Sequence, residues 1–183
     1  MSKPDLSAYD NSDFNPGKGF LFRTIWFYLN SWILKSYLFP VSSLKIFVLR
    51  LFGAKIGRGV VIKPNVNIKY PWNLSIGDYT WIGEGVWIDN LTQVTIERNC
   101  CISQNALLFC GNHNFKKVTF DLMTQKVELK EGSWVGANAT VCPGVVLFEN
   151  AILTAGSVAT SSLDENGIYQ GNPAQKIKER TIS

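Results

Sequence analysis

The feature that most constrains this chain is an aliphatic side chain that returns in steps of six residues from Ile56 onward. The positions are Ile56, Ile62, Ile68, Ile76, Ile82, Ile88, Ile96, Ile102, Leu108, Leu129, Val135, Val141, Leu147, Leu153 and Ala159. Neither the helical period of about 3.6 residues nor the alternation of an ordinary strand produces this spacing. Such a unit fits one short strand and a turn, and three units close a triangular coil that stacks on the next at about 4.8 Å. The period therefore predicts an all-β solenoid, a parallel β-helix.

The repeat keeps its frame through five coils, with one long interruption. The coils run over residues 56–73, 76–93, 96–113, 129–146 and 147–164, with two-residue insertions at 74–75 and 94–95. Residues 114–128 form the interruption, and we expect them to protrude, because insertions in solenoids map to surface loops that often carry function. His113, the only histidine, closes the coil from which this loop departs.

The repeat also divides the chain into parts. Residues 54–164 would form the body, between an N-terminal segment, 1–53, and a C-terminal extension, 165–183. The extension contains "GNPAQKIKER", a turn followed by a cationic run, for which we expect a short helix in solvent. A chain of 183 residues suits one well-buried domain with such attachments.

Residues 20–52 are the most apolar part of the N-terminal segment. Four cations interrupt them, and the longest charge-free run, 24–34, is about half the length that crosses a bilayer. We expect two amphipathic helices divided at Pro40. They either pack on the solenoid or make a peripheral membrane contact, with aromatic side chains inserted and cations at the lipid headgroups.

Charge and cysteine usage narrow the partners and the compartment. The net charge of +4 is mild and the Lys and Arg residues are scattered, so we expect no nucleic-acid partner. The cysteines are Cys100, Cys101, Cys110 and Cys142. They lack Cys-x-x-Cys spacing and fall on inward or half-buried repeat positions, which favours reduced thiols in a cytoplasmic protein. The start of the chain has no apolar run after a basic leader, so we expect no secretory signal; a membrane contact would place the protein at the inner face of the membrane.

Four stretches carry a resemblance to a known family. They are "LRLFGAKIGRGVVIKPNVNIKYPWNLSIGDYTWIG", "VTIERNCCISQNALLFCGNH", "GSWVGANATVCPGVV" and "QGNPAQKIKER". Over residues 44–180 the chain closely resembles the hexapeptide-repeat O-acetyltransferases of exopolysaccharide synthesis, the colanic acid acetyltransferase group. The resemblance implies a left-handed β-helix, a homotrimer, acetyl-CoA bound between neighbouring subunits and a sugar or glycan acceptor.

The resemblance also assigns residues. His113, in "CGNHNF", matches the histidine that serves as general base, and Trp134, in "GSWVG", matches a tryptophan beside the pantetheine arm. The expected contacts of acetyl-CoA are Trp134, Ala137, Ala155, Thr160, Lys176 and Lys178. The expected contacts of the acceptor are Asn90, Asn112 and Asn114. No metal is expected.

Acetyl transfer from a thioester to a sugar hydroxyl needs a base for the hydroxyl proton. A neutral imidazole can act as this base, typically with an effect of about 10²- to 10⁴-fold on the rate, and no covalent enzyme intermediate is required. The backbone N–H of Gly111 or of Trp134 could stabilise the oxyanion, and the sequence does not choose between them.

Two alternatives stay open at this stage. N-acetylation of an amino sugar needs the same base and donor. A non-catalytic trimeric scaffold would explain why Asn114 and Ser161 depart from the family's pattern. A third class, the γ-type carbonic anhydrase, shares the solenoid but binds its metal through three histidines, and the single His113 fails that count.

Overall fold

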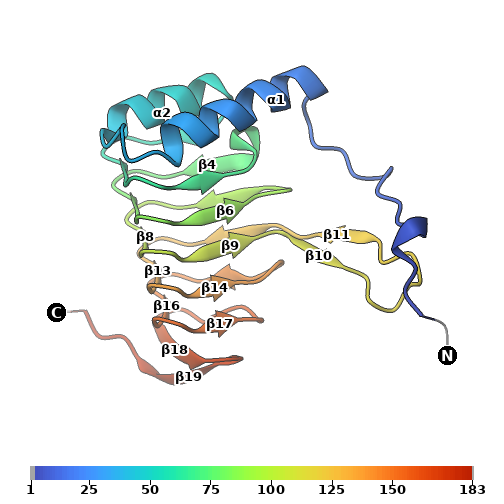
Figure 1. The fold of residues 1–183 in the computed structure, drawn as a ribbon. Coiled ribbons are helices and arrows are strands. Elements are labelled where there is room, and N and C mark those ends of the chain that lie inside the picture. Colours follow the sequence, from blue (N-terminus) through green and yellow to red (C-terminus); the bar gives the residue numbers. More distant parts are fainter. Residues whose placement is uncertain (1–2, 183) are drawn as a thin grey trace.

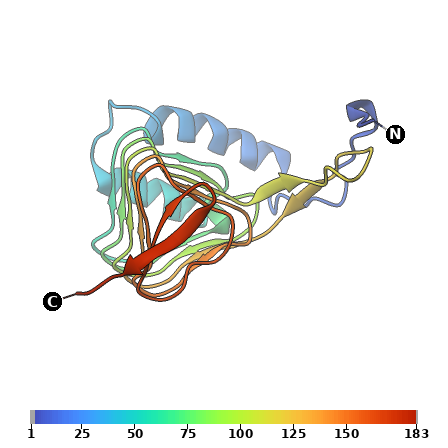
Figure 2. The same cartoon turned by 90° about the horizontal axis from the view of Figure 1, so that it is seen from below.

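The structure is a computed structural model that describes residues 3–182. A triangular solenoid of short parallel strands forms the body, helices lie across its first coil, and a two-stranded arm projects from it (Figure 1). Seen along the solenoid axis, the arm leaves from one corner of the triangle (Figure 2). The predicted all-β solenoid with an N-terminal helical segment and one protrusion is confirmed.

Three sheets form the walls, with parallel pairing throughout except between the last two strands of the second sheet. The first sheet contains β1 (Lys55–Ile56), β4 (Leu74–Ile76), β7 (Val94–Ile96), β12 (Val127–Leu129) and β15 (Val146–Leu147). The second sheet contains β2 (Val61–Ile62), β5 (Trp81–Ile82), β8 (Cys101–Ile102), β13 (Trp134–Val135), β16 (Ile152–Leu153), β18 (Gly167–Gly171) and β19 (Ala174–Glu179). The third sheet contains β3 (Asn67–Ile68), β6 (Trp87–Asp89), β9 (Leu107–Phe109), β14 (Thr140–Val141) and β17 (Val158–Ala159).

The second sheet shows how the six-residue period becomes a core. The inward residues that pair in register from coil to coil, each 0% exposed, are Ile62, Ile82, Ile102, Val135 and Leu153. Each such burial stabilises the fold by about 1.5–3 kcal/mol. The coils stack so closely that a Cβ added to Gly136 would lie 2.5 Å from the backbone nitrogen of Ala155. A glycine is therefore needed at that position.

Five coils are complete, as predicted, and a sixth is partial. Leu163 forms an isolated bridge to Leu147, and β18 pairs with β16 as a further layer. The two-residue insertions extend β4 and β7 without breaking the wall, because Leu74 and Val94 are themselves buried.

The predicted C-terminal helix is wrong, because the extension forms an antiparallel hairpin of β18 and β19. The last complete coil leaves the edge of β16 with backbone groups that need partners, and β18 supplies them through the pairs Ile168 with Ile152 and Tyr169 with Leu153. Gly171, at a φ of +103°, allows the chain to reverse before β19.

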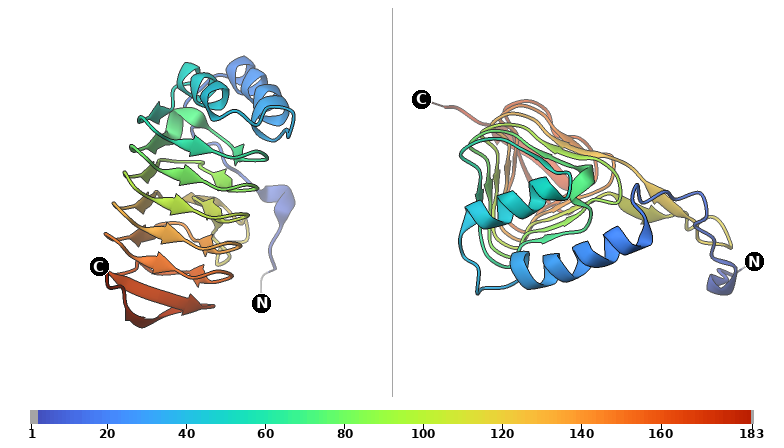
Figure 3. Two further views of the ribbon diagram at one scale, coloured as in Figure 1. Left: turned by 90° about the vertical axis from the view of Figure 1, so that its left-hand side faces the viewer. Right: turned by 90° about the horizontal axis from the view of Figure 1, so that it is seen from above.

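The N-terminal segment forms a short 3₁₀ turn, η1 (Leu6–Ala8), followed by α1 (Phe20–Leu29), a π-helical turn η2 (Asn30–Leu34) and α2 (Ser42–Leu51). We call α1, η2 and α2 the helical cap; they lie across the first coil (Figure 3). Trp26 is 2% exposed and its indole N–H donates to the carbonyl oxygen of Ile68 at 2.9 Å. Within residues 3–182, no helix has both the length and the apolarity of a membrane span.

The arm consists of β10 (Gly111–His113) and β11 (Leu122–Thr124), paired antiparallel. The excursion thus begins at Gly111, inside the third predicted coil, and the wall resumes with β12. The N-terminal segment contacts the arm from Asp5 onward, where the backbone N–H of Asp5 donates to the carbonyl oxygen of Val118 at 2.9 Å. The N-terminal segment and the arm therefore support each other.

Candidate active site

His113 ends β10 and is half-buried between the arm and the N-terminal segment. Its Nδ1 lies 2.9 Å from the carbonyl oxygen of Phe120. A carbonyl oxygen only accepts hydrogen bonds, so Nδ1 carries the hydrogen, and Nε2 of the neutral ring carries the lone pair. The arm therefore selects the tautomer in which Nε2 can accept a proton.

Two aromatic rings hold the imidazole. Phe120 stacks on His113 with ring centroids 4.5 Å apart and planes inclined by 7°, and the ring of Tyr9 lies at 5.8 Å. The backbone N–H of His113 donates to Oδ1 of Asn112 at 2.8 Å. These contacts come from β10, from the loop that joins β10 to β11, and from the N-terminal segment.

Phe120 has a φ of +52°, in the left-handed region. This conformation costs a bulky L-residue about 1–2 kcal/mol. It lets Phe120 present both its carbonyl oxygen and its ring to the imidazole of His113. Backbone strain of this kind clusters at functional sites, where the surrounding structure maintains it.

His113 lines a polar pocket of about 680 Å³, which we call the His113 pocket. Its other walls come from the N-terminal segment, α1, the third-sheet side of the first coils and the arm, through Tyr9, Asn11, Ser12, Phe14, Pro16, Arg23, Lys69, Tyr70, Asp89, Leu91, Gly111 and Leu122. Lys69 Nζ forms an ion pair with Asp89 at 2.9 Å inside it. The pocket therefore brings hydroxyl, amide and charged groups to the face of the imidazole, as a polyhydroxylated ligand requires.

The three asparagines expected at the acceptor have different places. Asn90 is 0% exposed; its Oδ1 accepts from the backbone N–H of Tyr70 at 3.0 Å and its Nδ2 donates to the carbonyl oxygen of Tyr70 at 2.6 Å. This amide is satisfied inside the coil and does not reach the His113 pocket, so Asn90 is not retained as an acceptor contact. Asn112 is exposed beside His113, and Asn114 uses its Oδ1 to accept from the backbone N–H of Lys116 at 3.1 Å.

The residues expected at acetyl-CoA lie mainly along the second sheet. Trp134 is 43% exposed on the outer face of β13, and its Nε1 donates to Oγ of Ser103 at 2.9 Å. Ala137 and Ala155 occupy the same corner of successive coils, since the backbone N–H of Gly156 donates to the carbonyl oxygen of Ala137 at 2.8 Å. Both side chains are small, and Ala155 is exposed.

Three other expected contacts are exposed at the C-terminal end. Lys176 and Lys178 lie on β19, and Lys176 Nζ pairs with Glu179 at 2.8 Å. Thr160 follows β17, at the edge of the third sheet rather than of the second. The structure therefore groups the lysines with Trp134 on one sheet and separates Thr160 from them.

Comparison with known proteins agrees with these features. No family model matches the chain. A curated relative, the putative colanic acid biosynthesis acetyltransferase WcaF of Escherichia coli strain K12, is 40% identical over 134 residues, which are 73% of this chain and 74% of WcaF. The chain belongs to the hexapeptide-repeat acetyltransferases, in the colanic acid biosynthesis group. It is therefore an acyltransferase.

Solved structures share the fold of this acetyltransferase. A hexapeptide-repeat acetyltransferase from Vibrio cholerae, complexed with acetyl-CoA, superposes with a TM-score of 0.79 at 16% identity, covering 88% of each chain. A galactoside acetyltransferase in complex with coenzyme A superposes with a TM-score of 0.75 at 20% identity, covering 88% of this chain and 80% of its own. At these identities the likeness concerns the fold.

Within one chain of the acetyltransferase, the expected base and the expected donor contacts do not meet. His113 follows the third-sheet strand β9, at the corner where the arm departs, whereas Trp134 stands on the second sheet, and the His113 pocket contains none of the residues expected at acetyl-CoA. The oxyanion alternatives also separate, because the backbone N–H of Trp134 already donates to the carbonyl oxygen of Ala151 at 2.9 Å. Gly111 is the candidate that remains.

Sequence reasoning missed four residues that shape the site of the acetyltransferase: Tyr9, Arg23, Lys69 and Phe120. They come from the N-terminal segment, the first coil and the arm, and none of them is one of the inward aliphatic positions that define the repeat. Thiols take no part in the pocket, since Cys110 is 0% exposed and burial raises its pKa to about 11. In the described part of the chain, no three His, Cys, Asp or Glu side chains gather as a metal site.

Proposed function

We propose that this acetyltransferase moves an acetyl group from acetyl-CoA to a hydroxyl of a polysaccharide or glycan precursor, with His113 as general base. One observation carries the proposal: Nδ1 of His113 is committed to the carbonyl oxygen of Phe120, which leaves the lone pair on Nε2 of an imidazole that lines a polar pocket. The relatives support the substrate class, since one is described as a colanic acid biosynthesis acetyltransferase and another as a galactoside O-acetyltransferase of Escherichia coli.

In this mechanism the acceptor hydroxyl donates its hydrogen to Nε2 of His113 as its oxygen attacks the thioester carbonyl. The N–H of Gly111 is our candidate for stabilising the oxyanion of the tetrahedral intermediate. Collapse of that intermediate expels the CoA thiolate, which takes up the proton held by His113. No cysteine of the chain needs to act, and positioning of the two substrates supplies much of the remaining acceleration.

The active site of this proposal is completed by a second subunit. His113 and Trp134 lie on different sides of one solenoid, so a cyclic homotrimer would bring the arm corner of one chain against the second sheet of its neighbour. Acetyl-CoA would then lie between subunits, against Trp134, Ala137 and Ala155. Lys176 and Lys178 at the end of the same sheet suit the CoA phosphates.

A direct test is acetyl-CoA titration by calorimetry, followed by thiol release with a panel of glycans and amino sugars. We expect micromolar binding of acetyl-CoA at about one site per chain and transfer to a sugar hydroxyl. His113→Ala should lower turnover at least about a hundredfold with the assembly intact. Near-normal turnover in that variant would refute the role of His113, and transfer only to amino sugars would make the enzyme an N-acetyltransferase.

Mixed assemblies test the shared site. Assemblies of His113→Ala chains alone, or of Trp134→Ala chains alone, should be inactive. When the two variants are refolded together in equal amounts, about a quarter of the interfaces should combine an intact His113 from one chain with an intact Trp134 from its neighbour, and about a quarter of the wild-type activity should return. Absence of any regain, with mixing shown by mass spectrometry, would place both residues in sites built from one chain.

We also propose that the helical cap contacts an anionic bilayer at the cytoplasmic face of the membrane. The helical cap and residues 35–41, which join η2 to α2, expose the large apolar side chains of Phe20, Leu21, Ile25, Phe27, Tyr28, Trp32, Tyr37, Leu38, Val41, Leu44, Phe47 and Leu51. Residues 14–77 contain nine Lys or Arg and no Asp or Glu. An apolar surface within a purely cationic segment matches the chemistry of an anionic lipid surface, where each basic residue adds about 1 kcal/mol.

Vesicle sedimentation tests this contact. The protein should bind phosphatidylglycerol-containing vesicles and not phosphatidylcholine vesicles. The double variant L38N/F47N should bind about tenfold more weakly, whereas Phe115→Asn, which removes an exposed aromatic ring of the arm, should bind normally. Equal sedimentation of the double variant and the wild type would contradict the proposal.

A further inference from the structure

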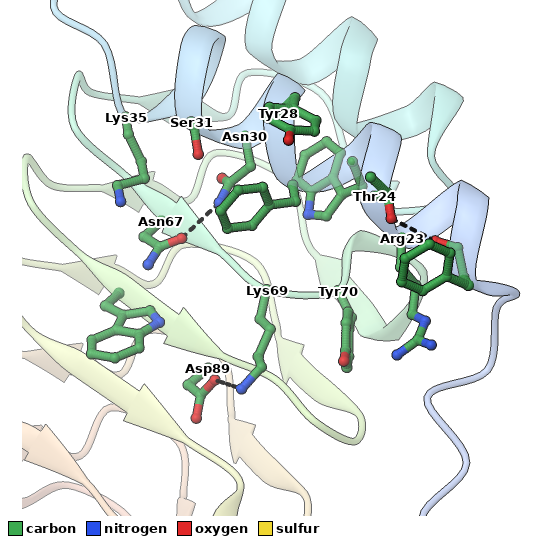
Figure 4. Close-up of a pocket in the computed structure, with 14 residues that line it drawn as sticks. Arg23, Thr24, Tyr28, Asn30, Ser31, Lys35, Asn67, Lys69, Tyr70 and Asp89 are labelled. Carbon is green, nitrogen blue, oxygen red and sulfur yellow. Dashed lines mark hydrogen bonds and ion pairs between the residues drawn. The ribbon is translucent and has the colours of Figure 1, made fainter.

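A second pocket, of about 410 Å³, lies between α1 and the outer face of the third sheet. We call it the α1 pocket; Figure 4 shows its lining. α1 and η2 contribute Arg23, Tyr28 and Asn30, and the first two coils contribute Asn67 and Trp87. No residue expected at acetyl-CoA lines it.

The α1 pocket adjoins the His113 pocket. The two pockets share four of their lining residues: Arg23, Lys69, Tyr70 and Asp89. The two pockets therefore form one groove along the third sheet, with the imidazole at the arm end and α1 over the other end. A ligand whose reacting hydroxyl lies at His113 can extend directly into the α1 pocket.

Contacts with the first coil fix the roof of this pocket. Beside the Trp26 indole bond to Ile68, the side-chain amide of Asn30 donates to Oδ1 of Asn67 at 2.7 Å and accepts from the backbone N–H of Ile68 at 3.3 Å. Asn30 is 7% exposed, so these bonds are shielded from water. The pocket is therefore preorganised, which reduces the ordering that a ligand must impose.

The charge of the shared wall favours an anion. Lys69 and Asp89 neutralise each other at 2.9 Å. Arg23 has no such balance: its Nε is buried without a hydrogen-bond partner, and its guanidinium faces both pockets. A buried donor without an acceptor costs free energy that a ligand oxygen would recover. A guanidinium matches the two oxygens of a carboxylate or a phosphate especially well.

The third-sheet side of the α1 pocket also provides an apolar platform. Trp87, on the outer face of β6, is 46% exposed, and Tyr70 stacks on Trp72 with ring centroids 4.9 Å apart. Rigid aromatic faces bury the apolar face of a sugar ring at small entropic cost, while amides such as Asn67 suit its hydroxyls.

We propose that the α1 pocket is an acceptor subsite for a negatively charged sugar unit, whose carboxylate or phosphate binds Arg23 while the ring of the same or the adjacent sugar packs on Trp87. The proposal rests on the proposed function, because it assigns the His113 end of the groove to the reacting hydroxyl. It makes the acceptor an anionic glycan rather than a neutral one.

Saccharide binding to the full chain, measured by calorimetry, tests the subsite. The probes are a glucuronate-terminated disaccharide, its glucose-terminated counterpart and glucose 1-phosphate. At least one anionic probe should bind about tenfold more tightly than the neutral disaccharide, and the carboxylate and phosphate arms identify which anion the subsite prefers. Arg23→Gln should remove the preference and leave the neutral affinity unchanged. Trp87→Ala should weaken the binding of charged and neutral disaccharides alike.

The matched control is Arg58→Gln, which removes an exposed arginine that lines neither pocket and pairs with Asp78. If it reduces the anion preference as much as Arg23→Gln, the preference is a general effect of positive charge and the proposal is refuted. Equal affinity for charged and neutral probes, or no binding of any probe, also refutes it. Acetyl-CoA titrated into the same samples keeps the outcomes apart, because failure to bind acetyl-CoA counts against the proposed function and not against the subsite.

Discussion

Replacement of Phe120 isolates the part of the site that orients the base. Phe120 contributes a backbone carbonyl oxygen, 2.9 Å from Nδ1 of His113, and a ring that stacks on the imidazole at 4.5 Å. Asparagine tolerates the left-handed conformation that Phe120 adopts at a φ of +52°. Phe120→Asn therefore removes the ring and keeps the carbonyl oxygen where it is.

The expected magnitude follows from these two contributions. Loss of the aromatic stack costs about 0.5–1.5 kcal/mol, and relief of the left-handed strain returns about 1 kcal/mol. Global stability should therefore change by less than about 1 kcal/mol. The stacking energy no longer holds the imidazole in the orientation that reacts. If the whole of this energy, about 0.5–1.5 kcal/mol, is added to the activation free energy, kcat decreases by about 2- to 12-fold. KM for acetyl-CoA should not change.

The assay is steady-state thiol release, paired with urea unfolding on the same preparations. Phe120→Tyr keeps the ring and should restore kcat. Phe115→Asn, on an exposed ring of the same arm, should have no effect. The reasoning fails if Phe120→Asn keeps the wild-type kcat, or if its loss appears in KM instead. A decrease of about a hundredfold would mean that the carbonyl contact was lost as well.

Three further predictions concern buried side chains. Lys45 is 0% exposed, and burial lowers its pKa, so the folded state disfavours its charge. Lys45→Met should therefore raise the free energy of unfolding at pH 7 by about 1 kcal/mol. This gain should shrink as the pH rises toward 10.5, which thermal unfolding at several pH values would measure. Ile102→Ala, in the central coil, should lower that free energy by about 2–5 kcal/mol in urea unfolding, and a loss below about 1 kcal/mol would contradict the packing. Burial raises the pKa of Cys110 from 9.0 to about 11, so iodoacetamide at pH 8 should label the thiol only after unfolding. Because the unfolded thiol ionises first, the contribution of Cys110 to stability should fall between pH 9 and about 11.

The coils were predictable because a solenoid repeats one packing problem. Each inward position, such as Ile102 between Ile82 and Val135, meets the same neighbours in every coil, so the same kind of residue returns. The C-terminal hairpin was not predictable in this way. The run "AQKIKE" is cationic and lacks a periodic apolar face, and its pairing depends on the free edge of β16, which becomes evident only when the coils are assembled.

Of the candidate site, too, only the part that the repeat positions could be predicted from the sequence. His113 became a candidate because it ends the third predicted coil, where the period stops, and because "CGNHNF" resembles the histidine motif of the family; the structure places it on the arm strand β10. Asn90 was expected at the acceptor because a polar residue near a corner suggests a surface contact. In the structure its side-chain amide instead accepts from the backbone N–H of Tyr70 and donates to the carbonyl oxygen of Tyr70, which only a group that both donates and accepts can do. Tyr9 and Arg23 reach the pocket through the path of the N-terminal segment, which no local pattern specifies.

The position of His113 on an arm explains why a regular solenoid carries an irregular N-terminal segment. Outward side chains of the coils stand on flat walls, which suit an extended ligand such as the proposed acetyl-CoA but cannot enclose a sugar. The arm carries the imidazole away from the wall, and residues 9–23 close the space between them, contributing Tyr9, Asn11, Ser12, Phe14, Pro16 and Arg23 to the His113 pocket. On the proposed function, the coils bind the donor, while the N-terminal segment and the arm select the acceptor. Acceptor choice can then change through residues outside the repeat, because these residues are free of the packing that fixes the coils.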